Sequence, residues 1–207
     1  MNKEELLAME TRYRANLINS LGGFKSVVLI GTRDTNGLEN LSIFSSLFHL
    51  GANPALCGLI VRPDVSERHT LENIIETGSY TINHLHKDIA VKAHQTSARY
   101  TKEQSEFEQV GLTPLYKEGI YAPFVHESVV RFACEFREMV PLQINGTILV
   151  IGEIVHIDIP SEIIAESGFV NIEAAGTLTC SGLDSYHTTQ KLVQLSYAKP
   201  DQWPREI

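Results

Sequence analysis

The sequence predicts a mainly β protein, an antiparallel barrel with short helical insertions. Long runs rich in Val and Ile recur along the 207 residues, and turn pairs such as Asn36-Gly37, Asn53-Pro54 and Asn145-Gly146 separate them. The stretches with helical spacing are short. Strands and helices show no regular alternation of the kind that builds a parallel sheet. A chain of this length can bury a substantial core in one large domain.

The individual elements follow from the same patterns. Apolar residues recur at helical spacing over residues 3–20, and Gly22-Gly23 ends this N-terminal helix. The predicted strands cover Ser26–Thr32, Leu41–Leu50, Ala55–Val61, Ser79–Asn83, Ser128–Met139, Ile144–Ile157 and Gly176–Ser181. The predicted short helices cover Thr70–Glu76, Ile89–His94, Gln104–Val110 and Pro160–Ala165. Two prolines in the tail after Tyr197 predict an extended end that packs on a neighbouring molecule.

The segment 25–48 carries the first functional signal. Asn36-Gly37 joins two β-rich runs, and both residues tolerate a positive φ, which is typical of a β-hairpin. Between residues 39 and 62 the chain has no Asp, Glu, Lys or Arg, yet it contains Asn40, Ser42, Ser45 and Ser46. Hydroxyl groups in such an apolar strand indicate hydrogen bonds to a bound ligand, and a phosphate with an aromatic ring would fit. The alternative is that the serines satisfy groups at a strand edge.

Composition excludes several other functions. The net charge of −8 argues against a nucleic acid partner, because phosphate binding depends on Lys and Arg. No apolar run is long enough to span a bilayer, so we expect no membrane partner. The first residues mix acids and bases and lack the apolar core of a signal peptide, so the expected compartment is the cytoplasm. Cys57, Cys134 and Cys180 lie far apart and are expected to be buried, reduced thiols.

Residues 84–102 form a basic segment in this acidic chain. Four Lys and Arg residues stand there against one Asp, and three histidines accompany them. Such a segment indicates a small anionic ligand, with a solvated basic loop as the alternative. His84 and His86 alternate on one strand face, and His94 is near, so a three-histidine metal site is conceivable. No carboxylate–histidine motif reinforces it, and we predict no metal.

Common catalytic signatures are absent from the sequence. There is no GxG of a Rossmann fingerprint, no Gly-Lys-Ser/Thr of a P-loop and no GxSxG elbow. The catalytic residues are therefore unknown at this stage.

Five motifs in order resemble a known family. The run SVVLIGTRDTNGLENLSIFSSLFHLGANPALCGLIV resembles the opening of the flavin reductase-like proteins, the FMN-binding split barrels. The helix start Thr70–Ile74 is similar to their T-x-x-N-I, and Gly78–Asn83 to their G-x-F-x-x-N strand. Ser105-Glu106-Phe107 with Gly111-Leu112, and the strand Thr147–Ile157, resemble two further family motifs. The resemblance covers about residues 20 to 190.

The resemblance implies a fold and a domain organisation. The expected fold is an antiparallel, Greek-key split β-barrel that binds FMN non-covalently near the interface of a homodimer. The predicted division is an N-terminal helix (1–20), the flavin reductase-like split-barrel domain (21–190) and a C-terminal extension (191–207).

The resemblance also assigns candidate cofactor-binding residues. The strand that contacts the flavin ring and ribityl chain corresponds to Ser45, Ser46 and Leu47. Polar groups near the phosphate correspond to Arg62, His69, Thr70 and Asn73, where Thr70 is predicted to cap the following helix. The loop over the flavin corresponds to His94, Gln95, Thr96, Ser97 and Ala98, inside the basic segment. The alternative roles are structural. Thr70 and Asn73 would then be a helix cap and a polar group of a turn, and Arg62 would form a surface ion pair with Asp64 or Glu67.

Function follows from the same resemblance. Many members pass a hydride from NADH or NADPH to flavin and supply a partner monooxygenase. The sequence therefore predicts an FMN-binding flavoprotein, an NAD(P)H-dependent flavin reductase. Two alternatives stay open: an FMN-binding redox carrier without turnover, and a split-barrel relative that acts on another substrate or on heme.

Overall fold

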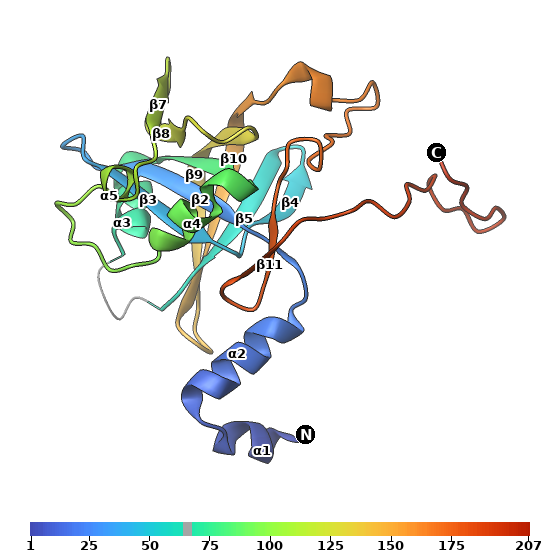
Figure 1. Cartoon of the computed structure of the whole chain (residues 1–207), viewed down its shortest axis with the longest axis horizontal. Coiled ribbons are helices and arrows are strands. Elements are labelled where there is room, and N and C mark those ends of the chain that lie inside the picture. Colours follow the sequence, from blue (N-terminus) through green and yellow to red (C-terminus); the bar gives the residue numbers. More distant parts are fainter. Residues whose placement is uncertain (64–67) are drawn as a thin grey trace.

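The computed structural model of the chain describes residues 1–63 and 68–207, and its main body is an antiparallel β structure (Figure 1). Seven strands form one sheet in the order β3-β2-β6-β9-β10-β5-β4. Their bounds are Val28–Arg33 (β2), Glu39–Phe44 (β3), Phe48–Ala52 (β4), Ala55–Val61 (β5), Ser79–His84 (β6), Arg131–Leu142 (β9) and Thr147–Asp158 (β10). Every neighbouring pair in this sheet runs antiparallel. The predicted fold class is thus confirmed.

Two small sheets and several short helices complete the body. The strands β1 (Lys25–Ser26), β11 (Thr179–Ser181) and β12 (Ser185–His187) form one small sheet, and β7 (Pro114–Lys117) and β8 (Ile120–Val125) form the other. The helices of the body are α3 (His69–Thr77), α4 (Ala90–Gln95) and α5 (Glu106–Val110), with 3₁₀ turns at Lys87–Ile89 and Ser161–Ile163. No helix in the described ranges is long and apolar enough to cross a membrane.

The core lies on both faces of the long sheet. Successive side chains of β2 point to opposite faces of the sheet. Because both faces are covered, the apolar part of β2 is buried throughout. Leu29 packs with Leu41, Leu85 and Phe107 on the face that α4 and α5 cover. Val28 and Ile30 pack with residues of β5, β6 and α3 on the other face. This burial on both faces explains why the sequence of β2 begins with a continuous apolar run.

Two predicted elements are each divided in the structure, and the predicted helix Pro160–Ala165 is only a 3₁₀ turn at Ser161–Ile163. The single predicted strand Leu41–Leu50 is divided into β3 and β4 by the break Ser45–Leu47. The single N-terminal helix over 3–20 is divided into α1 (Lys3–Ala8) and α2 (Thr11–Leu21). The second division has a local cause, because the Glu10 carboxylate accepts hydrogen bonds from the Arg12 and Tyr13 amides and so starts a new helix.

Candidate functional site

The break between β3 and β4 is held open by hydrogen bonds from neighbouring elements. The Ser46 hydroxyl donates to the Ile60 carbonyl at 3.0 Å and accepts from the Ile60 amide at 3.1 Å. The Leu47 carbonyl accepts from the Ser26 hydroxyl at 2.6 Å. The amides of Ser45, Ser46 and Leu47 donate to no other residue that the structure describes. Three backbone donors are therefore available together in this short segment.

Strand β3 leads into this break along the edge of the sheet. Its only strand neighbour is β2 among the described residues, so one row of its amides and carbonyls points away from the sheet. At the start of that row, the Leu41 amide donates to a Glu106 carboxylate oxygen at 3.0 Å. Glu106 is buried, and this loss of hydration raises the pKa of its carboxyl despite the Leu41 bond. Glu106 thus covers one end of the edge, and the Ser45–Leu47 break lies at the other.

A buried polar network fixes α3 against the β2–β3 hairpin. The Asn40 amide group donates to the Thr32 hydroxyl at 3.2 Å and to the Thr70 hydroxyl at 2.9 Å. The Asn73 amide group donates to the same Thr32 hydroxyl at 3.1 Å. The prediction that Thr70 caps the helix is wrong, because Arg68 is the N-cap residue and the Thr70 hydroxyl faces Asn40. Thr70 and Asn73 therefore have a structural role in positioning α3.

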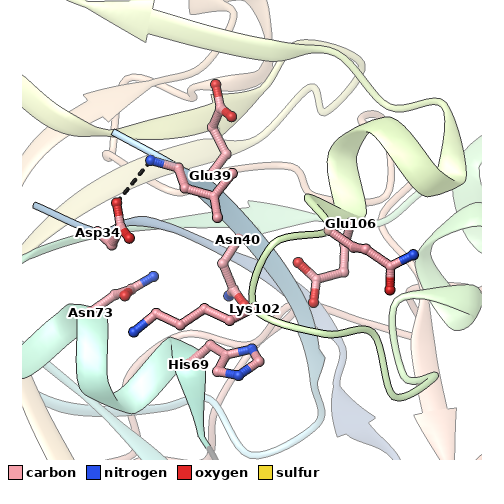
Figure 2. A pocket seen from close by; sticks show the side chains of 9 residues that line it. Asp34, Glu39, Asn40, His69, Asn73, Lys102 and Glu106 are labelled. Atoms are coloured by element: carbon pink, nitrogen blue, oxygen red, sulfur yellow. Dashed lines mark hydrogen bonds between the residues drawn. The ribbon is translucent and has the colours of Figure 1, made fainter. Parts of the chain in front are cut away.

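A small pocket opens beside this network (Figure 2). His69 and Asn73 of α3 line one side of it, and Asn40 and Glu106 line the other. Lys102 extends across it toward Asn73 in Figure 2, and its ammonium lies 3.6 Å from a Glu72 carboxylate oxygen. The buried Asn73 side-chain oxygen has no hydrogen-bond partner among the described residues. The pocket thus brings two predicted residues, His69 and Asn73, together with Lys102 and Glu106, which the sequence did not assign to the site.

The predicted loop 94–98 lies at the end of α4. The His94 Nδ1 atom is 2.7 Å from the Tyr186 hydroxyl, and the two rings meet edge to face. Burial, with lesser contributions from Cys180 and Asp184, raises the pKa of Tyr186 to about 12, so its hydroxyl is protonated at neutral pH. The direction of the hydrogen bond between the Tyr186 hydroxyl and His94 Nδ1 depends on the tautomer of the imidazole, and in either direction it ties the end of α4 to β12.

The other residues of this loop differ in what they can offer a ligand. Gln95 donates to the Tyr100 hydroxyl at 3.0 Å, and the buried Thr96 hydroxyl donates to the Ala93 carbonyl at 2.8 Å. Ser97 and Ala98 are exposed and form a turn through their amides. Thr96 therefore stabilises the end of its own helix.

The C-terminal hairpin connects this loop to the break. Tyr186 of β12 pairs with Cys180 of β11. Burial raises the pKa of the Cys180 thiol, and the charge of Lys25 and the neighbouring Ser45 side chain partly oppose this shift. His94, Tyr186, Cys180 and Ser45 thus form a contiguous series that joins residues far apart in the sequence. Sequence reasoning gave Cys180 and Tyr186 no role in the site, since no motif surrounds them.

Arg62 lies near the break through strand β5. It is exposed and follows Ile60, the residue that holds Ser46, by two positions. Residues 64–67, which include the proposed partners Asp64 and Glu67, lie outside the described residues.

The polar side chains of the basic segment 84–102 contact different parts of the molecule. Burial lowers the pKa of His84 to about 4, so this side chain is neutral at physiological pH. Lys92 donates to the Gly111 carbonyl at 2.6 Å. His84 Nδ1 lies near the Thr177 hydroxyl and His86 Nε2 near the Glu127 carbonyl, so the two rings face different partners. All four cations of the segment are exposed: Lys87, Lys92, Arg99 and Lys102.

Comparisons with known proteins agree with this arrangement. The family described as flavin reductase like domain matches residues 21–175. The chain is 53% identical to a solved candidate flavin reductase with a split barrel domain from Shewanella frigidimarina, with a TM-score of 0.92 over 95% of this chain and 98% of that one. A curated relative, an uncharacterised protein from Aquifex aeolicus, is 27% identical over 70% of this chain and 74% of its own length.

Two more distant structures share the fold. Nitrilotriacetate monooxygenase component B from Bacillus cereus is 22% identical, with a TM-score of 0.82 over 94% of this chain and 97% of its own. The 2-nitrobenzoate 2-nitroreductase from Pseudomonas fluorescens is 21% identical, with the same TM-score over 98% of both chains.

Proposed function

Because this chain belongs to the flavin reductase-like family, we propose that it binds FMN non-covalently and reduces it with NADH or NADPH. The observation that carries the proposal is the break at Ser45–Leu47, where three backbone amides lack partners among the described residues. This break lies beside the Tyr186–His94 pair and at the end of the free edge of β3. Such a row of donors suits the carbonyl and ring-nitrogen acceptors of a flavin ring.

The geometry supports an extended ligand along the edge of β3. From Leu41, where Glu106 covers the edge, to Leu47 the strand direction spans roughly 20 Å. We propose that the ring lies at the break and that the phosphate lies toward Arg62 and the start of α3. The first turn of a helix of nine residues favours an anion there. The Lys102 ammonium, which lines the pocket beside α3, belongs to the same end.

Each residue then has a defined task. When bound, FMN supplies the redox chemistry by accepting a hydride and passing the electrons on. The Ser46 hydroxyl keeps the break open by holding Ile60, so the amides stay oriented toward the ring. Amide dipoles oriented in this way favour negative charge, and they would therefore favour the reduced flavin. Tyr186 fixes the ring of His94 and thereby holds the end of α4 over the site.

Partners remain part of the proposal. We propose that the chain is a homodimer with the flavin near its interface, and that a partner monooxygenase consumes the reduced flavin. The second idea is supported by the Bacillus cereus neighbour, which is named as a monooxygenase component. A cytoplasmic location and the division into residues 1–20, 21–190 and 191–207 stay predictions from the sequence.

The experiment that tests the activity is anaerobic mixing of the FMN-loaded protein with NADH or NADPH. We expect the absorbance of oxidised flavin to bleach within one turnover, faster with one of the two nucleotides. If neither bleaches it while dithionite does, the protein is an FMN carrier without nicotinamide turnover. The visible spectrum of the purified protein tests the remaining alternative, a split-barrel relative that binds heme, because a heme protein is red and a flavoprotein is yellow.

A further inference from the structure

A second cavity, of about 340 Å³, lies at the C-terminal end of α3. The end of α3, the start of β6 and the start of β8 line it, together with a stretch each of β9 and β10. Its volume falls in the range of sites that bind small organic molecules. The small pocket of Figure 2 lies at the other end of α3, where His69 begins the helix. None of the residues that line the second cavity is a candidate flavin residue, so the flavin proposal gives this cavity no role.

Part of the lining is apolar and aromatic. Phe136 and Val155 belong to it, and Val155 is 43% exposed. Tyr121 also lines the cavity, and its hydroxyl donates to the Asp34 carbonyl at 2.7 Å, which holds the ring in place. The face of an aromatic ring attracts cations, and the Arg33 guanidinium already lies 5.4 Å from the centre of the Tyr121 ring. This lining therefore suits an apolar group that carries a positive charge.

The charged residues at the cavity carry an excess of negative charge. The Arg137 guanidinium lies 2.8 Å from a Glu135 carboxylate oxygen and 2.7 Å from a Glu153 carboxylate oxygen. One guanidinium thus pairs with two carboxylates, so one negative charge is left over. All three side chains are partly exposed, and surface ion pairs of this kind contribute little to stability. A cationic ligand can therefore compete with Arg137 for the Glu135 carboxylate.

The end of α3 adds to this negative charge. Thr77 is the last residue of the helix and Gly78 its C-cap, and both line the cavity. The C-terminal end of a helix carries a partial negative charge, which a cation near the last turn usually balances. The structure describes α3 throughout, and its last turn contains no Lys or Arg but does contain Glu76. The helix therefore supplies no cation of its own, and a cation bound in the cavity would balance this charge.

The lining and the charge together favour one class of ligand. We propose that the cavity binds a small organic cation, a primary ammonium or guanidinium group on a short apolar group. The charged group faces Glu135 and the end of α3, and the apolar group lies against Phe136 and Val155. An ammonium or guanidinium donates several hydrogen bonds, which suits carboxylate and carbonyl oxygens. An anion would meet the excess carboxylate and the negative helix end, and a bare metal ion would leave the apolar lining unused.

Three probes of similar shape and different charge test the ligand class. Phenethylammonium is a cation, 2-phenylethanol is neutral and 3-phenylpropionate is an anion, and each carries the same phenyl group. In calorimetric titrations of the full-length protein we expect phenethylammonium to bind at least tenfold more tightly than 2-phenylethanol. The anion should show no measurable binding. Equal affinity for all three probes, or no binding of the cation, would overturn the proposal.

Variants of the lining place the ligand in the cavity. Glu135→Gln removes the carboxylate charge and keeps the shape of an exposed side chain, whereas Val155→Trp fills the space. Glu138→Gln is the matched control, because Glu138 is an exposed residue of the same strand that does not line the cavity. We expect either lining variant to weaken phenethylammonium binding at least tenfold and the control to leave it unchanged. A folded Glu135→Gln protein with the affinity of the control contradicts the proposal, and Val155→Trp provides the same test independently.

A titration in the presence of FMN separates this cavity from the flavin site. Saturating FMN should leave the affinity for phenethylammonium unchanged, because the two sets of residues do not overlap. Competition between FMN and the cation would place the cation in the flavin site and overturn the proposal. A protein that takes up no FMN but binds the cation through Glu135 refutes the proposed function and supports the cation site.

Discussion

At the residue scale, His84 makes stability depend on pH. Its pKa falls from 6.5 to about 4 in the folded chain because the ring is buried against Thr177. Between these values the unfolded chain binds a proton that the folded chain does not, so stability falls as the pH falls. The expected loss from pH 7.5 to pH 5 is about 2 kcal/mol. Urea denaturation at pH 7.5 and pH 5 should show this loss in the free energy of unfolding. In His84→Gln the contribution of about 2 kcal/mol should be absent. An identical pH dependence in the two proteins would exclude His84 as the cause.

Ser46 has a structural role that a second variant can isolate. Ser46→Ala removes both hydrogen bonds to Ile60 and leaves the backbone groups of Ile60 without their partner. We expect a loss of about 1–3 kcal/mol in the free energy of unfolding. Ser97→Ala, at an exposed position of the loop, is the control and should change it by less than about 0.5 kcal/mol. Equal denaturation midpoints for the two variants would refute the role of the Ser46 hydroxyl.

At the scale of elements, Gly31 lets the β7–β8 hairpin lie against β2. A Cβ atom at Gly31 would be 2.2 Å from the Pro123 carbonyl oxygen of β8 and 2.6 Å from the Thr81 hydroxyl. Since the carbonyl is backbone, Gly31→Ala should destabilise the fold by about 3 kcal/mol. At Gly22 the φ is −68° and the nearest atom is 3.6 Å away, so Gly22→Ala should be neutral within about 0.5 kcal/mol. Thermal unfolding of both variants compares them, and a stable Gly31→Ala protein would contradict this packing.

The same scale shows which elements the sequence could predict. The strand Ala55–Val61 was predicted with its observed bounds, because a continuous apolar run between turn residues leaves little choice. The β7–β8 hairpin was not predicted, because Pro114 and Pro123 argue against strands in these two segments. The two strands pair with each other outside the long sheet, where proline is tolerated. The break at Ser45–Leu47 was missed for another reason. It depends on Ser46 bonding to Ile60, a tertiary contact that local patterns do not encode.

At the scale of the whole molecule, the family motifs predicted more of the site than periodicity did. They pointed to Ser45–Leu47 and to the loop 94–98, which the structure brings together through Tyr186 and Cys180. Those two residues could not be found from the sequence, since they come from a hairpin about 90 residues beyond the loop. The roles of the predicted site residues in cofactor binding stay predictions.

FMN titration of the full-length protein tests the central claim most directly, with two variants that separate amide from hydroxyl at the break. Ser45→Ala keeps the amide and removes the hydroxyl, whereas Ser45→Pro removes the amide donor. We expect one FMN per chain in the unmodified protein, similar affinity in Ser45→Ala, and at least tenfold weaker binding in a folded Ser45→Pro. No uptake of FMN by the unmodified protein, or equal affinity in all three, would contradict a flavin site at Ser45–Leu47.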